Sequence, residues 1–160
     1  MKTIVADIKK TFLPSRTFAY IRHQGPYMGD TQLFERIFNQ VATWVTRNGL
    51  FKADSEAITI YHDDPKTVSP DDRRISVGFT VPEGTEGDAE IKTTIIPSGD
   101  FVIGSFEIEE KEYADAWQSL FEYLNSNGFK PSGHIMYESY KNDPTKHPEG
   151  KHMVDICISV

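Results

Sequence analysis

The sequence is poor in cysteine, because Cys157 is the only one among 160 residues. An intramolecular disulfide is therefore impossible, which excludes a disulfide-stapled secreted domain and favours a reducing compartment. Asp7 and Lys9 interrupt the short apolar run at the N-terminus, so it lacks the core of a signal peptide. The sequence also has no apolar run near the ~18 residues that would span a bilayer. We expect a cytoplasmic protein that does not enter the membrane.

Positive charge is also scarce. Lys and Arg number 17 against 24 Asp and Glu, which gives a formal net charge of -7. This balance argues against a protein that binds the phosphate backbone of nucleic acid without sequence preference. Hydrophobic residues make up 38%, charged residues 26% and aromatic residues 12% of the chain, so disordered, collagen-like and coiled-coil classes are excluded. The composition predicts an ordinary globular domain with no direct nucleic-acid partner.

The chain contains an internal repeat. An offset of 83 places residues 6–15 over residues 89–98, with Phe18 on Phe101, and an offset of 79 then aligns residues 34–81 without a gap. Within that second alignment, each Asn-Gly and each Asp-Pro pair falls on its counterpart. We therefore predict a single domain built by tandem duplication, with halves near 1–82 and 83–160.

Both halves show the same periodicity. Apolar residues at helical spacing are followed by an Asn-Gly stop, and strictly alternating segments follow each helix. The expected helices are 30–47 and 112–126, and the expected strands after them are 56–62, 75–81, 134–140 and 154–160. Because each helix leads into a hairpin, we predict an α+β fold: a duplicated strand-helix-strand-strand unit, a mainly antiparallel sheet and two helices.

The last strand of each half has two different faces. One face is apolar and should lie under the helix, whereas the other carries mostly small residues: Arg74, Ser76, Gly78 and Thr80, then Met153, Asp155, Cys157 and Ser159. In the preceding strand of the first half we take Ile58 and Ile60 to point inward beneath the helix. Two such halves related by a pseudo-twofold axis would enclose a hollow with a floor of small residues. We predict a ligand cleft between the halves.

One carboxylate distinguishes the two halves at this predicted cleft, since Glu138 replaces Thr59. Its expected neighbours are aromatic: Tyr140, Tyr61, and either Trp117 or Trp44. A carboxylate among aromatic rings suits a flat lipophilic cation. The alternatives stay open, because a strand glutamate is often solvent-exposed or paired, here with Arg74, and aromatic residues are often core.

Other kinds of site have little support. The five histidines do not fall at zinc-ligand spacing, and with one cysteine we predict no metal site and no cofactor. Cys157 alternates with core residues on a terminal strand, so we expect a buried small residue and not a nucleophile.

Four segments carry a family resemblance: 20–27 (YIRHQGPY), 60–65 (IYHDDP), 136–144 (MYESYKNDP) and 154–158 (VDICI). Together they resemble the GyrI-like family, which covers bacterial DNA gyrase inhibitor proteins and the effector-binding domains of AraC-type and MerR-type transcription regulators. The resemblance implies the duplicated fold with a ligand cleft between its halves. It also implies that Glu138 contacts cationic aromatic drugs, with Tyr140, Tyr61 and Tyr27 as an aromatic wall.

Three functions are compatible with this resemblance. The first is a stand-alone protein that binds small cationic or amphipathic aromatic molecules, sequestering or sensing drugs or toxins. The second is a partner of DNA gyrase that acts through protein contact. The third is a hydrolase of electrophilic aromatic toxins in which Glu138 activates water beside Tyr140. We expect binding and not catalysis, no direct DNA binding because the chain shows no helix-turn-helix module, and a monomer or homodimer.

Overall fold

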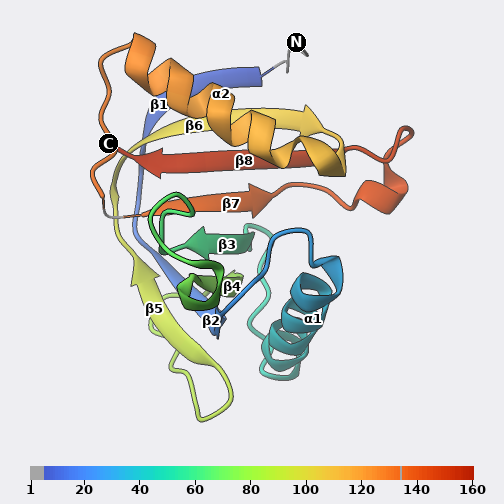
Figure 1. The fold of residues 1–160 in the computed structure, drawn as a ribbon. Helices are drawn as coiled ribbons and strands as arrows, with labels where there is room; N and C mark the ends of the chain where they lie inside the picture. The colour runs from blue at the N-terminus through green and yellow to red at the C-terminus, as the bar shows by residue number, and fades with distance from the viewer. Residues whose placement is uncertain (1–5, 134) are drawn as a thin grey trace. The chain divides into compact units, whose positions relative to one another are not determined.

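The computed structural model describes residues 6–133 and 135–160; residues 1–5 and His134, which begins one predicted strand, lie outside this part. The described chain forms two compact units. Of the described residues, unit 1 comprises 6–13, 99–133 and 135–160, and unit 2 comprises 14–98. Each unit contains four strands that pair antiparallel and one long helix, which confirms the predicted α+β class (Figure 1).

In unit 2, the strands lie in the order β3 (Ala57–Tyr61), β4 (Arg74–Val81), β2 (Arg16–Gln24) and β5 (Lys92–Ile96). The helix α1 (Thr31–Arg47) packs on one face of these strands. Ile37, Val41 and Val45 repeat at helical spacing, and they are buried in one core cluster with Ile75 and Val77 of β4.

Unit 1 is built in the same way. Its strands lie in the order β1 (Ala6–Leu13), β6 (Gly99–Ile108), β8 (His152–Ser159) and β7 (Met136–Tyr140). The helix α2 (Tyr113–Ser126) buries Ala116, Leu120 and Leu124 in a cluster with Val154 and Ile156 of β8. Both helices and all four strands that follow them overlap the ranges predicted from periodicity.

The first strand of each repeat pairs outside its own repeat. β1, which begins the first repeat, pairs with β6 of the second repeat, whereas β5, which begins the second, pairs with β2 of the first. The compact units therefore differ from the halves 1–82 and 83–160 of the sequence repeat by the exchange of one strand each.

The helix ends follow local sequence signals. The side chain of Asp30 accepts a hydrogen bond of 3.1 Å from the backbone N–H of Leu33, which caps the start of α1. A capping box between Glu109 and Glu112 precedes α2. Both helices end at Asn-Gly, and Gly49 and Gly128 have φ of 65° and 74°, a conformation that favours glycine.

The register of unit 1 places Glu138 on the helix-covered face. Glu138 lies directly opposite Ile156 of β8, and Tyr140 lies opposite Val154. Directly opposed residues of antiparallel strands share a face, and Val154 and Ile156 pack in the α2 cluster. Glu138 and Tyr140 therefore point toward the side of the sheet that carries α2.

The assumed orientation of β3 is wrong. Ile58 and Ile60 lie opposite Gly78 and Ser76, on the face away from α1, whereas Thr59 lies opposite Val77 under the helix. Hydrophobicity could not distinguish the two orientations, because Ile58 and Thr59 are both fully buried. Gly78 also marks a close approach of β2 to β4: a Cβ there would lie 1.9 Å from the carbonyl oxygen of Ala19.

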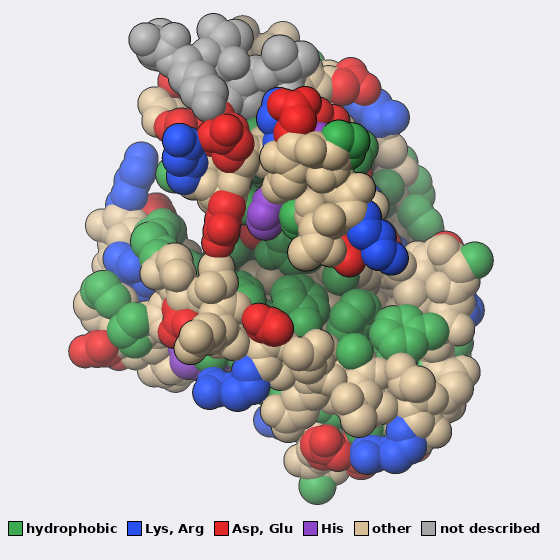
Figure 2. Space-filling model, turned by 90° about the vertical axis from the view of Figure 1, so that its right-hand side faces the viewer, with side chains coloured by type: hydrophobic (Ala, Val, Ile, Leu, Met, Phe, Trp, Pro, Cys, Tyr) green, Lys and Arg blue, Asp and Glu red, His purple; other side chains and the backbone are tan. Residues whose placement is uncertain are grey.

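Among the described residues, neither helix is long and apolar enough to cross a membrane. The surface face in Figure 2 mixes acidic and basic side chains, with hydrophobic side chains exposed between them.

Candidate ligand site

Glu138 is a buried carboxylate in the middle of β7, only 4% exposed. Its Oε2 accepts a hydrogen bond of 2.6 Å from the indole Nε1 of Trp117 on α2, and its Oε1 accepts one of 2.7 Å from the hydroxyl of Tyr140. Each carboxylate oxygen thus has a fixed donor. Hydrogen bonds to an ionised acceptor are stronger than neutral ones, so the two aromatic donors stabilise a negative charge at this position.

Local structure explains why these three side chains meet. Glu138 and Tyr140 are two residues apart on one strand, so they share a face. Trp117 lies on the face of α2 that packs against the sheet, one turn before the buried Leu120. The predicted grouping of Glu138 with Tyr140 and Trp117 is therefore present within unit 1. Arg74, the alternative ion-pair partner, instead binds Asp63 at 3.0 Å.

A second polar pair lies beside this group, and the sequence analysis missed it. The hydroxyl of Tyr113, one turn before Trp117 on α2, lies 2.7 Å from Nδ1 of His152 on β8. The two rings meet edge to face with centroids 5.4 Å apart. Burial raises the pKa of Tyr113 above its usual value, and the negative charges of Glu138 and Glu110 raise it further. Tyr113 therefore stays protonated at neutral pH, and its hydroxyl shares a hydrogen bond with the imidazole.

The sequence carried one signal that Tyr113 lies beside the Glu138 group. Tyr113 and Trp117 are four residues apart, and residues four apart share a helix face. Nothing local connects Tyr113 to His152, which lies 39 residues away in sequence.

Unit 2 holds an aromatic cluster on its helix side, where Thr59 stands at the position equivalent to Glu138. Tyr27 is buried, with its ring centroid 5.7 Å from that of Tyr61 and 6.3 Å from that of Phe34. Tyr61, Phe34 and Phe38 are each partly exposed. Tyr27 and Tyr61, the two further residues predicted for the site, therefore contact each other. Trp44 is a core residue whose indole donates to Asp88 at 2.9 Å.

The predicted floor of small residues is buried in part. Met153 is 42% exposed, but Ser76 is 2% exposed and Cys157 3% exposed, so these last two side chains are part of the packed interior. They lie on the sheet faces away from the helices, whereas Glu138 lies on a helix side. The expectation that Glu138 shares a face with this floor is therefore wrong, and that error follows from the orientation assumed for β3.

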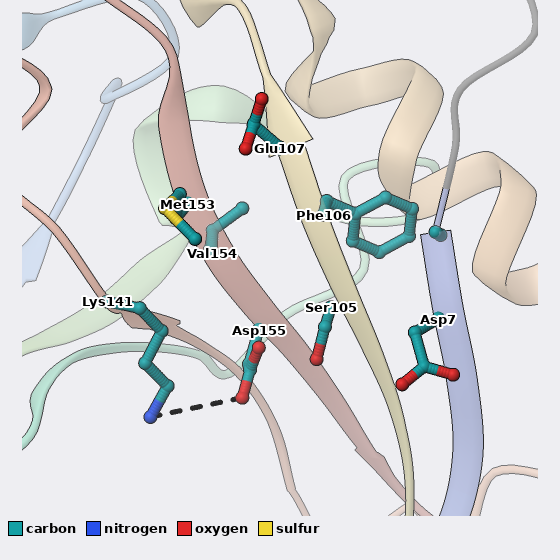
Figure 3. Close-up of a pocket in the computed structure, with 9 residues that line it drawn as sticks. Asp7, Ser105, Phe106, Glu107, Lys141, Met153, Val154 and Asp155 are labelled. Carbon is teal, nitrogen blue, oxygen red and sulfur yellow. Dashed lines mark ion pairs between the residues drawn. The ribbon is translucent and has the colours of Figure 1, made fainter. Parts of the chain in front are cut away.

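A shallow pocket of about 260 Å³ lies elsewhere in unit 1 (Figure 3). Asp7, Ser105 and Asp155 cross it in one row on β1, β6 and β8, and Asp155 pairs with Lys141 at 3.9 Å. Met153 and Asp155 of the predicted floor line this pocket, whereas Glu138 and the aromatic residues predicted around it do not. Within residues 6–133 and 135–160, no cluster of three metal-ligating side chains occurs.

A family model decides the relationship of this chain to known proteins. The model for the GyrI-like small molecule binding domain matches residues 6–160. The chain belongs to the GyrI-like family. The resemblance inferred from the four sequence segments is thereby confirmed.

Individual GyrI-like relatives agree with this assignment. A DNA gyrase inhibitor of Pectobacterium carotovorum subsp. carotovorum (strain PC1) is 30% identical over 146 residues, which cover 88% of each chain. The crystal structure of the EcmrR C-terminal domain superposes with a TM-score of 0.79 at 18% identity, covering 99% of this chain and 98% of that one. The structure of SAV2435 bound to tetraphenylphosphonium superposes with a TM-score of 0.64 at 11% identity, covering 96% and 93%. The two structural similarities establish the shared fold.

Proposed function

We propose that this GyrI-like protein binds small lipophilic cations, with Glu138 as the counter-charge. The observation that carries this proposal is the buried carboxylate of Glu138, held by hydrogen bonds from Trp117 and Tyr140. Burying a carboxylate costs several kcal/mol unless it is paired, roughly the penalty of a desolvated ion. A cationic ligand would supply the opposite charge and offset this cost at the moment of binding.

The aromatic side chains would supply the rest of the recognition. Trp117 and Tyr140 hold the carboxylate and at the same time present ring surface, and a cation over such a ring gains roughly 0.5–2 kcal/mol. We propose that Tyr61 and Tyr27 add further aromatic surface for the apolar part of the ligand. The structure of SAV2435 bound to tetraphenylphosphonium, a lipophilic cation, supports this ligand class.

A matched pair of ligands tests the counter-charge. Methyltriphenylphosphonium is a cation, and triphenylphosphine oxide is a neutral molecule of similar size. We expect wild-type protein to bind the cation, and Glu138→Gln to bind it at least about tenfold more weakly, a loss of about 1.4 kcal/mol. Affinity for the neutral compound should change little. Binding is measured by isothermal titration calorimetry.

Glu122→Gln is the control variant, because Glu122 is an exposed acid on the same helix as Trp117. It should bind the cation as the wild type does. Equal affinity of wild type and Glu138→Gln for the cation would refute the role of Glu138.

We propose DNA gyrase as a second candidate partner. The support is the Pectobacterium relative, which is named a DNA gyrase inhibitor and is 30% identical over 88% of the chain. The cytoplasmic location expected from the single cysteine would place the two proteins together. Purified wild-type protein should reduce supercoiling by gyrase in a gel assay. If contact with gyrase does not use the ligand site, the Glu138→Gln variant should reduce supercoiling as much as the wild type does. Unchanged supercoiling at a large excess of protein would exclude this partner.

The hydrolase hypothesis for Glu138 and Tyr140 stays a prediction. Both oxygens of Glu138 already accept hydrogen bonds, an arrangement that suits a fixed counter-charge better than a general base awaiting a proton.

A further inference from the structure

Unit 2 contains a second polar group, on the sheet face away from α1. Ser76 lies in the middle of β4, opposite Arg22 of β2 on one side and Ile60 of β3 on the other. His62 follows directly after β3 and reaches the same hydroxyl. Arg22 and His62 come from two of the segments that carry the family resemblance. The proposed cation site at Glu138 uses neither of them.

The hydroxyl of Ser76 links the other two side chains. This hydroxyl, which is 2% exposed, lies 2.7 Å from Nε2 of His62 and 3.4 Å from Nε of Arg22. A guanidinium nitrogen can only donate, so the Ser76 oxygen accepts from Arg22. We assign the Ser76 proton to Nε2 of His62, the acceptor 2.7 Å away. In this tautomer the proton of the neutral imidazole lies on Nδ1, which is then a donor.

Arg22 and His62 are exposed, so the donors that they do not use within the described part of the protein are open to solvent. The two terminal nitrogens of Arg22 and Nδ1 of His62 make no hydrogen bond to any residue within 6–133 and 135–160. The Arg22 guanidinium is nevertheless held in place, because it lies 5.8 Å from the centre of the Tyr20 ring in addition to contacting Ser76. A positioned guanidinium with free terminal nitrogens is the usual receptor for a planar or tetrahedral oxyanion.

The electrostatic surroundings favour an anion here, although the whole chain is acidic. Partial burial of the His62 ring lowers its pKa to about 4, with the charges of Arg22 and Arg74 as further causes, and Asp63 opposes the shift. Arg74 is itself engaged, since both Asp63 oxygens accept from its guanidinium at 3.0 Å. Arg22 is thus the positive charge that remains available beside the imidazole.

We propose that Arg22 and His62, joined through Ser76, form a binding site for an oxyanion, that is, a carboxylate, sulfate or phosphate group. The Arg22 terminal nitrogens would bind two oxygens of the anion, and His62 would donate from Nδ1. The site lies on unit 2 and recognises negative charge, so it is distinct from the cation site at Glu138.

Sulfate is the first probe, because its charge is constant over the pH range in which His62 titrates. The imidazole resonances of nitrogen-15-labelled protein are followed by NMR between pH 3 and 8, in sodium sulfate and in sodium chloride of equal ionic strength. A nearby negative charge stabilises the imidazolium, so we expect sulfate to raise the proton affinity of His62 about tenfold over chloride.

Arg22→Gln should abolish the difference between sulfate and chloride, although the proton affinity of His62 should rise in both salts once the Arg22 charge is gone. Arg47→Gln is the matched control, because Arg47 is an exposed arginine of the same unit that pairs with Glu90. It should retain the sulfate effect. A sulfate effect that persists in Arg22→Gln, or that is absent from the wild type, would overturn the proposal.

Acetate at pH 7 is the second probe, and it distinguishes a site that accepts carboxylates from a site for tetrahedral inorganic oxyanions. Shifts of the His62 ring and the Ser76 amide with both probes would support a site open to carboxylates. Shifts with sulfate alone would support a site for tetrahedral inorganic oxyanions. No saturable shift with either probe would again refute the site.

Discussion

The two units share one fold but differ in chemistry at equivalent positions. In unit 1 the helix side of the sheet carries a carboxylate, an indole donor and a hydroxyl: Glu138, Trp117 and Tyr113. The residues at the equivalent positions of unit 2, 79 residues earlier, are Thr59, Phe38 and Phe34. Unit 2 forms the same strand order and the same helix packing without a buried carboxylate. The Glu138 group is therefore not a requirement of the fold.

This comparison strengthens the functional interpretation of Glu138. A buried ion pair or hydrogen-bonded charge is often no more stabilising than uncharged residues that fill the same space, and unit 2 has an uncharged residue, Thr59, at this position of the fold. A buried charge that the fold does not need is more readily explained by ligand binding. Exchanging the residues that differ between the two units tests this interpretation.

The largest effect is expected when the carboxylate is transplanted into unit 2. Thr59 is fully buried, and position 38 there holds phenylalanine in place of an indole donor. Thr59→Glu should lower the free energy of unfolding by about 3 kcal/mol or more, because the new charge is buried without the indole donor that Glu138 has in unit 1. Urea denaturation measures the loss, and the neutral Thr59→Gln isolates the part due to charge.

Adding Phe38→Trp should then restore part of the stability lost in Thr59→Glu, because the indole supplies the donor that Trp117 supplies in unit 1. The same Phe38→Trp in the Thr59→Gln background should restore less. Equal stability of Thr59→Glu and Thr59→Gln at pH 7 would show that unit 2 tolerates the charge, and the contrast between the units would lose its energetic basis.

A smaller effect is expected from the reverse exchange in unit 1. Glu138→Thr and Trp117→Phe together give unit 1 the residues of unit 2. Because hydrogen bonds to charged groups contribute about 1.5–3 kcal/mol, the two substitutions should be coupled by about that amount in a double-mutant cycle. Trp117→Phe should thus cost much less in the Glu138→Thr background than in the wild type. Additive losses would mean that the indole stabilises unit 1 by packing alone.

Sequence periodicity located the helices and the strands that follow them, but it did not show which face of each strand lies under a helix. The apolar spacing within 30–47 and 112–126 and the Asn-Gly pairs located both helices, since amphipathic helices have a single buried stripe. The orientation of β3 failed because Ile58 and Thr59 are both buried, so alternation of polarity carried no information there. The family resemblance and the replacement of Thr59 by Glu138 identified the buried carboxylate, although its place under α2 required the register of β7 and β8.

Tyr113 offers the smallest test of the comparison. Its hydroxyl contacts His152, whereas Phe34 at the equivalent position of unit 2 packs edge to face on Tyr27 without a hydroxyl. Tyr113→Phe removes one hydrogen bond of a buried pair and should lower the free energy of unfolding by about 1 kcal/mol. Tyr123→Phe is the control, because Tyr123 stacks on Phe129 through its ring, and this variant should fall within about 0.5 kcal/mol of the wild type.

The same variant separates a structural from a positioning role for Tyr113. If Tyr113 only packs, Tyr113→Phe changes stability and leaves the affinity for methyltriphenylphosphonium unchanged. If the Tyr113–His152 pair holds α2 and β8 so that Trp117 meets Glu138, affinity should fall about two- to fivefold, less than in Glu138→Gln because the carboxylate remains. The geometry favours the second result, since Tyr113 and Trp117 are one turn apart on α2, and a shift of that turn moves the donor of Glu138.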